Sequence, residues 1–327
     1  MSDLAPGAPP TPHTPPPRRS VTDLAAALYA SVSSTIKGKP DGLRLALTTL
    51  LSGGHLLVED LPGTGKTLLA KSLAAAMGGE FGRVQCTPDL LPSDITGTSV
   101  FQPNEGTWQF RPGPLFANVL LVDDINRASP RTQSALLEPM EERQVSVDGI
   151  THRLPVPFFC IATQNPSGQL GTFPLPESQL DRFSMTVSLG LPDRAAEREI
   201  ITGRGGVDQL PAVRTVTTPH EIAAAIASVH HLHCADSVVE YVLDLVAETR
   251  RDPALVTGVS PRVSSSVLAM ARAHAVVSGR DYVTPDDVQY VFAPGCAHRV
   301  ALAQGVDTAA AWPVLVGILG RVPVPRS

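Results

Sequence analysis

The sequence predicts an α/β fold in which helices cover both faces of a parallel sheet, followed by a smaller all-helical domain. Short apolar runs alternate with helical patterns up to about residue 189, as strands and helices do in parallel sheets. One of these runs leads into a glycine-rich loop and then a helix. Beyond Pro192 the strand patterns stop, and capped helix starts replace them.

Length and composition limit the classes of protein that fit. The chain has 327 residues, 43% of them hydrophobic, which is enough for two domains with a substantial core. A net charge of −5 and a pI near 6.0 disfavour a surface built for nucleic acid, so we expect no nucleic-acid partner. The four cysteines are widely spaced, as in a reduced cytoplasmic protein. Because no apolar stretch is as long as a membrane span, we expect no membrane insertion.

The N-terminal segment, residues 1–20, is dominated by proline. It cannot bury enough apolar surface to fold, so we expect a disordered tail, with a role as a proline-rich ligand left open. Arg18 and Arg19 precede an apolar segment, as in a twin-arginine export signal, but Asp23 interrupts that segment. We therefore expect the protein to stay in the cytoplasm.

The predicted core, residues 21–195, contains both helices and buried strands. We expect helices at 24–36, 43–51 and 67–77, and buried strands at 54–59, 119–122, 158–162 and 184–189.

The predicted helical domain, residues 196–322, is recognised by its helix starts. Thr218, Ser260 and Thr284 each precede a proline at the first turn of a helix. One apolar helical face is formed by Val238, Tyr241, Val242, Leu245 and Val246.

The glycine-rich loop, residues 62–68 (PGTGKTL), predicts a phosphate site. Glycines let backbone N–H groups turn towards an anion at a helix N-terminus, whose dipole favours negative charge. Gly63 and Gly65 provide the turn, Lys66 reaches the outer phosphates, and the Thr67 hydroxyl can bind Mg²⁺. Pro62, Thr64 and Leu68 complete the loop. The alternative is a chance lysine in an ordinary strand–turn–helix unit, but the strand and helix around the loop favour ATP with Mg²⁺.

A second buried strand ends in two carboxylates, Asp123 and Asp124. Asp123 is expected to hold Mg²⁺, partly through water, and Asp124 to polarise the attacking water. Taken alone, two acids after a strand could be a helix cap or a solvated loop. The phosphate loop upstream favours the catalytic interpretation.

The chain resembles the MoxR family of AAA+ ATPases between about residues 33 and 303. The matching segments are GHLLVED (54–60), TPDLLPSDITG (87–97), FRPGPLFAN (110–118), DINRA (124–128), TQSALLE (132–138), ATQNP (162–166) and LPESQLDRF (175–183). The resemblance implies an αβα sandwich with a five-stranded parallel sheet, a small all-α lid, ATP hydrolysis with Mg²⁺, and a hexameric homo-oligomer.

The resemblance also assigns roles to residues outside the loop and the acid pair. Asn165 resembles the sensor that places water near the γ-phosphate, the alternative being an Asn-Pro turn. Arg182 resembles an arginine finger inserted into a neighbouring subunit's site. Its alternative is a surface salt bridge with Asp181 or Glu177.

Two further nucleotide contacts are implied. Arg262 resembles a second sensor that reaches from the lid to the nucleotide, and otherwise it is a solvated arginine at a helix start. Gly38, in the segment 36–38, resembles the part of the family that lies against adenine.

The implied function is chaperone-like: ATP hydrolysis that remodels, matures or activates a protein client, often with a partner that carries a von Willebrand factor A domain. Family members commonly have glutamate where this chain has Asp124, so we expect slow hydrolysis. The second departure from the family is the segment 101–108, usually more acidic or glutamine-rich. Asp60 departs only from the strict phosphate-loop pattern, which has glycine there. The alternatives are a nucleotide-switch scaffold with little turnover and a DNA motor, which the acidic pI disfavours.

Two clusters are expected to have no separate function. His230, His231 and His233 lie between two expected lid helices without acidic residues at ligand spacing, so an exposed loop is expected. Three aromatic residues, Trp108, Phe110 and Phe116, lie around a predicted hairpin with little basic charge. This favours packing or a pore-facing role over base stacking.

Overall fold

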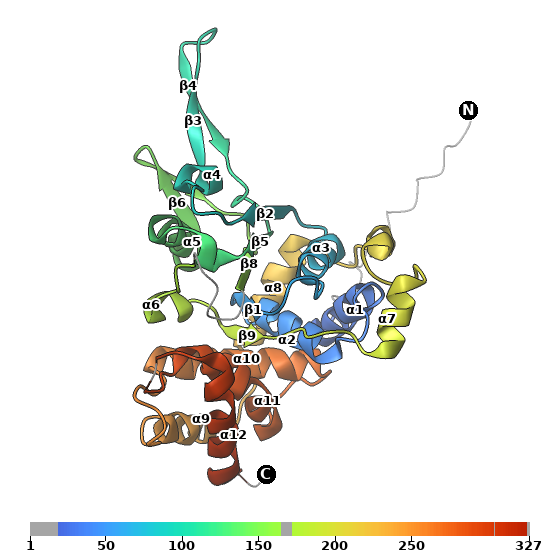
Figure 1. The fold of residues 1–327 in the computed structure, drawn as a ribbon. Helices are drawn as coiled ribbons and strands as arrows, with labels where there is room; N and C mark the ends of the chain where they lie inside the picture. Colours follow the sequence, from blue (N-terminus) through green and yellow to red (C-terminus); the bar gives the residue numbers. More distant parts are fainter. Residues whose placement is uncertain (1–18, 165–171, 304, 326–327) are drawn as a thin grey trace, which may run out of the picture.

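The α/β core lies between a projecting hairpin at one end and a helical lid, residues 236–303 and 305–321, at the other (Figure 1). The computed structural model describes residues 19–164, 172–303 and 305–325. The strands are β1 Leu56–Glu59, β2 Phe81–Gln85, β3 Gly97–Gln102, β4 Thr107–Pro112, β5 Val119–Asp123, β6 Gln144–Val147, β7 Ile150–Arg153, β8 Phe159–Gln164 and β9 Met185–Val187. The α-helices of the core are α1 Val21–Ser33, α2 Pro40–Leu51, α3 Lys66–Ala76, α4 Pro92–Thr96, α5 Pro130–Glu142, α6 Glu177–Leu180 and α7 Arg194–Ile201. Those that follow are α8 Pro219–His230, α9 Asp236–Thr249, α10 Pro261–Val277, α11 Pro285–Cys296 and α12 Thr308–Arg321. Short 3₁₀ turns are η1 Ile125–Arg127, η2 Val207–Ala212 and η3 Ala297–Arg299.

The central sheet has five parallel strands in the order β2-β5-β8-β1-β9, which confirms the predicted fold. The register pairs Glu59 with Gln164 and Gln85 with Asp123. The carboxyl ends of β1, β5 and β8 therefore meet at one edge of the sheet. This is the edge at which ligands bind in open α/β folds.

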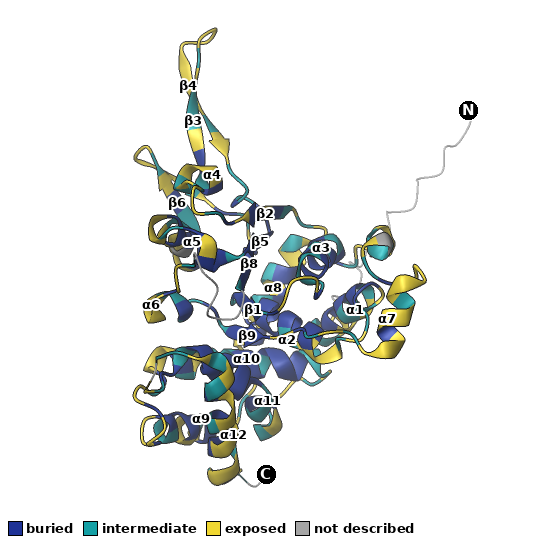
Figure 2. Cartoon of the chain, in the orientation of Figure 1, coloured by how far each residue is buried: buried dark blue, intermediate teal, exposed yellow. Residues whose placement is uncertain are grey.

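The two faces of the sheet belong to two separate apolar cores, because successive side chains of a strand point to opposite faces. Leu56 and Val58 pack with α1, α2 and α3, whereas Leu57 packs on the other face with α5. All three residues are fully buried, and Figure 2 shows the strands as the dark centre of the core.

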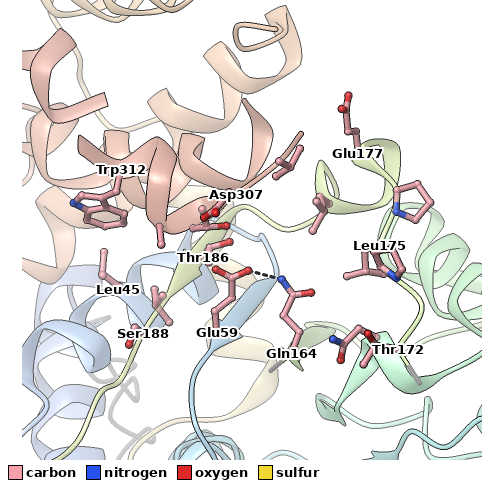
Figure 3. Close-up of a pocket in the computed structure, with 18 of the residues that line it drawn as sticks. Leu45, Glu59, Gln164, Thr172, Leu175, Glu177, Thr186, Ser188, Asp307 and Trp312 are labelled. Atoms are coloured by element: carbon pink, nitrogen blue, oxygen red, sulfur yellow. Dashed lines mark hydrogen bonds between the residues drawn. The ribbon is translucent and has the colours of Figure 1, made fainter. Parts of the chain in front are cut away.

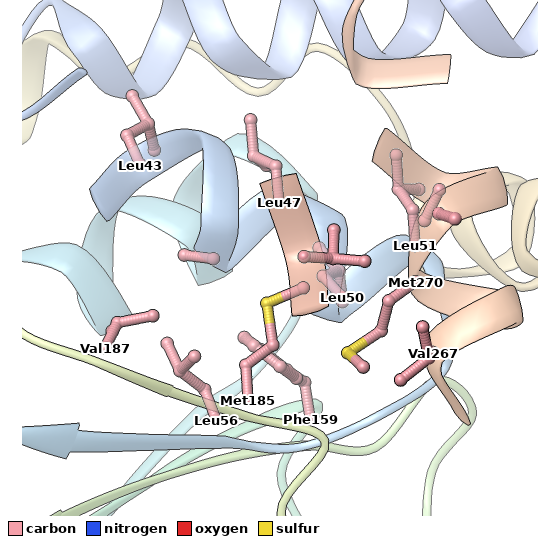
Figure 4. Packing of buried hydrophobic residues seen from close by; sticks show 14 of the residues in the cluster. Leu43, Leu47, Leu50, Leu51, Leu56, Phe159, Met185, Val187, Val267 and Met270 are labelled. Atoms are coloured by element: carbon pink, nitrogen blue, oxygen red, sulfur yellow. The ribbon is translucent and has the colours of Figure 1, made fainter. Parts of the chain in front are cut away.

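The lid is joined to the core by apolar packing. Met270 of α10 lies close to Met185 of β9 and to the leucines of α2 (Figure 4). A Cβ added to Gly295 would lie 2.5 Å from Cε of Met270, so α10 and α11 approach closely there and the Met270 side chain would have to shift to accept a larger residue. One continuous cluster of buried residues thus runs from α1 along one face of the sheet into the lid.

Two antiparallel hairpins, β3–β4 and β6–β7, extend from the core, and β3–β4 projects furthest (Figure 1). The ring of Phe110 stacks on His152, with centroids 3.9 Å apart, and meets Phe116 edge-on. Trp108 instead pairs with Phe101 and is 71% exposed. Phe110 and Phe116 therefore have the expected packing role, and Trp108 faces solvent.

The predicted helix starts of the C-terminal half are confirmed. Thr218 and Thr284 form capping boxes with Glu221 and Asp287, and Ser260 is the N-cap of α10. His230, His231 and His233 are exposed, and the described residues contain no group of His, Cys, Asp and Glu able to hold a metal ion. None of the described helices has the length and apolar character needed to cross a membrane.

Candidate nucleotide site

The phosphate loop connects β1 to α3 as the sequence predicts. Gly63 and Gly65 have φ angles of 84° and 94°, in the left-handed region that favours glycine. A Cβ added at either position would meet no described heavy atom within 4 Å, so the loop opens into free space. Its first helical N–H groups come from Lys66 and Thr67 of α3. An open, glycine-built loop at a helix N-terminus is suited to bind phosphate oxygens.

Lys66 folds back across the base of the loop. Its ammonium donates hydrogen bonds to the carbonyl oxygens of Asp60 and Leu61, at 2.9 and 3.1 Å. Carbonyls hold a lysine without neutralising its charge, so the positive charge remains beside the loop.

Asp60, the departure from the strict loop pattern, is a buried structural residue. Its carboxylate accepts hydrogen bonds from the Ser188 hydroxyl at 2.8 Å and from the N–H groups of Leu189 and Gly190 at 2.6 and 3.2 Å. Lys39 donates to the carbonyl oxygens of the same two residues, Leu189 and Gly190. Burial lowers the pKa of Lys39, and the nearby Asp60 charge opposes that shift. Residues 188–190 thus tie the phosphate loop to the segment that contains Gly38.

Gly38, the predicted adenine contact, lines a cavity of about 200 Å³ with Tyr29, Ile36 and Leu43. Its φ of 69° requires glycine, and an added Cβ would lie 2.6 Å from Cβ of Ala196 on α7. The lining also includes Ser33, Lys37 and Lys39, so the cavity combines apolar and polar walls.

The acid pair lies at the carboxyl end of β5, the strand next but one to β1. Asp123 is 8% exposed, and its carboxylate accepts a hydrogen bond from Nε of Arg83 at 2.8 Å. Asp124 has a left-handed backbone (φ 55°), and its N–H donates to the Thr163 hydroxyl at 2.9 Å. Gln85 donates to the Asp124 carboxylate at 3.2 Å. Both acids are therefore held in fixed positions.

Arg83 and Gln85 were missed because strand β2 was not predicted from the sequence. The signal was available: Phe81, Val84 and Cys86 are interleaved with polar residues in a short run before the TPDLLPSDITG segment.

Glu59 and Gln164 form a hydrogen-bonded pair at the ends of β1 and β8 (Figure 3). Burial raises the pKa of Glu59, and the hydrogen bond from Gln164 opposes that shift. The pair lies beside a cavity of about 1210 Å³ whose lining includes Asp307 and Trp312. Asn165, the predicted sensor, follows Gln164 directly and lies outside the described residues.

The two predicted arginines, Arg182 and Arg262, lie together and share one partner. Glu141, near the end of α5, forms ion pairs with Arg182 and with Arg262, the latter at 3.2 Å. Arg262 also lies 3.9 Å from the Asp181 carboxylate. Arg182 therefore pairs with Glu141 here, rather than with the Asp181 or Glu177 partners expected for a surface arginine. Glu141 was missed because it is far away in the sequence.

The chemistry of these groups fits Mg-ATP. The loop offers N–H donors and a lysine for phosphate oxygens, and Thr67 and Asp123 provide the oxygen atoms that Mg²⁺ prefers. Mg²⁺ would neutralise charge on the phosphates. Asp124 directly follows Asp123, the expected Mg²⁺ ligand, and its carboxylate can accept a proton from water.

Comparisons with known proteins agree with this architecture. The family model described as "ATPase family associated with various cellular activities (AAA)" matches residues 55–185, and the AAA lid domain matches residues 247–311. A candidate ATPase of known structure from Cytophaga hutchinsonii superposes with a TM-score of 0.83 at 32% identity, covering 94% of this chain and 96% of that one. The fold and the loop define an AAA+ protein with a helical lid.

Curated relatives identify the family within that class. The chain is 42% identical to the "Chaperone MoxR1" of Mycobacterium tuberculosis over 86% of its own length and 76% of the relative's. It is 31% identical to "Protein MoxR" of Paracoccus denitrificans, covering 91% and 95%. It is also 40% identical to a Bacillus subtilis protein, YeaC, covering 90% and 94%. The chain belongs to the MoxR family of AAA+ ATPases.

Proposed function

We propose that this protein binds Mg-ATP at the phosphate loop and hydrolyses it within a homo-oligomer, a hexamer, to remodel or activate a protein client in the cytoplasm. The observation that carries the proposal is the open loop of Gly63 and Gly65 at the N-terminus of α3, on the same edge of the sheet as Asp123 and Asp124. A phosphate site beside paired acids is the arrangement that ATP hydrolysis requires.

The position of Arg182 supports its action on a neighbouring subunit. The acid pair lies just before the N-terminal end of α5, whereas Arg182 pairs with Glu141 near the C-terminal end. A helix of 13 residues is about 20 Å long. An arginine side chain does not span that length, so an adjacent subunit is the better recipient. Arg262, which shares Glu141, is proposed to contact nucleotide from the lid in the assembled state.

Phosphate release by three variants tests the hydrolysis step. We expect Asp124→Asn to lower the rate about 100-fold, a loss typical of removing one positioned catalytic group, while ATP binding is retained. Asp124→Glu restores the longer acid and should raise the rate several-fold above native. Asp244→Asn changes an exposed lid carboxylate and serves as the matched control. A rate unaffected by Asp124→Asn would contradict the proposal.

The client is proposed by relation to the chaperone MoxR1, and a partner with a von Willebrand factor A domain is included on the same ground. The projecting hairpin supports client contact, since Phe101 of β3 and Trp108 of β4 are 45% and 71% exposed and the hairpin extends away from the core in Figure 2. A pull-down with Asp124→Asn and ATP should retain the client, whereas Lys66→Ala, with no ATP held, should not.

A nucleotide-switch scaffold is the second candidate, and one observation favours it. The Asp124 side chain is a methylene shorter than glutamate and is already held by Gln85. Such a protein would assemble with ATP but turn over at the same low rate in the native, Asp124→Asn and Asp124→Glu forms.

A further inference from the structure

The lid holds the chain on both sides of Arg182. On one side, Arg299 of η3 donates from Nη2 to the Asp181 carbonyl oxygen at 3.0 Å, and its Nε lies 3.2 Å from the Asp181 carboxylate. On the other side, Nε2 of His298 lies 2.7 Å from the Phe183 carbonyl oxygen. His298 and Arg299, two consecutive lid residues, therefore hold Phe183 and Asp181, which are the two chain neighbours of Arg182.

Both of these lid residues, His298 and Arg299, are buried. The Arg299 side chain is 5% exposed, and its other nitrogen, Nη1, donates to Ser266 and to the Gly295 carbonyl at 3.3 Å. Burial lowers the pKa of His298 to about 3, and the Arg299 charge acts in the same direction, so the ring is neutral at physiological pH. A neutral ring must carry its proton on Nε2 to donate to a carbonyl oxygen. Phe183, fully buried, anchors the same segment in the core.

The charges around this segment are connected. Asp181 faces Arg299 and Arg262, both from the lid, while Glu141 from the core faces Arg182 and Arg262. A movement of the lid that displaces Arg299 would therefore displace the backbone that carries Arg182. Helix α6, which leads into the segment, contacts η3 directly and lies next to the lid in Figure 1.

We propose that His298 and Arg299 are positioning residues for Arg182: through them, the lid of one subunit sets the place of the arginine that completes the ATP site of the next. This inference rests on the proposed function of Arg182. Its physical basis is that an arginine finger acts only in the correct geometry, and a displacement of about 1 Å can cost about 100-fold in rate.

The test mixes two defective proteins. Arg299→Lys keeps the charge but loses the planar fork that contacts both the carboxylate and the carbonyl of Asp181. Alone, it should lower the ATPase rate at least about 10-fold, with ATP binding at its own phosphate loop unchanged. Mixed with Asp124→Asn, which has an intact Arg182 but an inactive site, it should regain activity. Random mixing in a ring makes about one interface in four fully competent.

A parallel mixture separates this inference from the function on which it rests. Arg182→Ala mixed with Asp124→Asn must also regain activity, and failure there would overturn the shared site itself. If that pair recovers while Arg299→Lys with Asp124→Asn does not, only the positioning role is overturned. Equal oligomeric state in all mixtures is checked by sedimentation.

Non-additivity provides the second readout. In an Arg182→Ala background, Arg299→Lys should cause no further loss, because the residue through which it acts is gone. A full additional loss would show that Arg299 acts elsewhere. Arg251→Lys, at an exposed lid position, is the matched control. If Arg299→Lys unfolds the lid, Asp181→Asn is the substitute variant. It weakens the same Asp181–Arg299 interaction by a change in the core, and its ATPase activity must recover in the same way when it is mixed with Asp124→Asn.

Discussion

The phosphate loop and the arginine cluster are built in opposite ways. The loop is local: β1, the glycines and α3 follow one another within 21 residues, and Lys66 contacts carbonyls only five and six residues away. The arginine cluster joins α5, the segment after α6, α10 and η3, whose residues are separated by 40 to more than 100 positions. A local site survives small movements of the lid, whereas the cluster exists only when lid and core are packed together. Binding and hydrolysis should therefore respond differently to changes at the two places.

Arg182→Ala should cause the largest effect, about a 1,000-fold loss of ATPase rate, because arginine fingers contribute 10³ or more. Nucleotide binding by the isolated subunit should be unchanged, since the residue lies at the other end of α5. Steady-state phosphate release and fluorescent-ATP binding measure the two quantities. Equal losses of nucleotide binding and of ATPase rate would contradict the proposed difference between the phosphate loop and the arginine cluster.

Lys66→Ala is the contrasting change within the loop. It removes the charge beside the phosphates, so binding and hydrolysis should fall together, the rate by about 100-fold. The same two assays apply, with Lys71→Ala, five residues further along α3, as the control. Unchanged ATP affinity in Lys66→Ala would contradict the assignment of the loop.

Asp60→Ala tests the base of the loop. Loss of the buried carboxylate leaves the donors of Ser188, Leu189 and Gly190 without their acceptor, so the free energy of unfolding should fall by about 3 kcal/mol. Denaturant unfolding measures this loss, and the exposed Asp244→Ala should change it by less than about 0.5 kcal/mol. A loss no larger than that of the control would mean that Asp60 is not structural.

The smallest effect concerns the lid in acid. Burial alone would raise the pKa of Asp287, but hydrogen bonds from His274, Arg280 and Thr284 outweigh it and lower the pKa to about 2. A carboxyl whose pKa is lower in the folded state stabilises the fold above its unfolded pKa of 3.8 and loses this contribution as the pH falls towards 2. The melting temperature should therefore drop between pH 4 and 2, less steeply in Asp287→Asn. Equal slopes for the two proteins would rule out this source of acid sensitivity.

The same contrast explains what the sequence could predict. The loop, Asp123 and Asp124 could be predicted as site residues because each depends on a short pattern: a strand, a turn and a helix, or a strand that ends in acids. Arg182 and Arg262 were predicted only through family resemblance, and their common partner Glu141 was not predicted at all. No local pattern marks a residue whose importance comes from segments 41 and 121 positions further along the chain. His298 and Arg299 were missed for the same reason.

Four of the five strands of the sheet were predicted, among them the edge strand β9. Four strands appeared as apolar runs because both of their faces are buried. The fifth, β2, is an edge strand with exposed Arg83 and Gln85, so its run is interrupted. Asp60 departs from the loop pattern, and its three hydrogen bonds show that its carboxylate holds residues 188–190.

The most direct test of the shared site is ATPase activity per subunit measured against protein concentration, with the oligomeric state followed by sedimentation at each point. If Arg182 completes a neighbour's site, specific activity should rise steeply with concentration and level off when assembly is complete, and the Arg182→Ala protein should stay inactive throughout. A specific activity that is flat from the monomer to the assembled form would contradict the account.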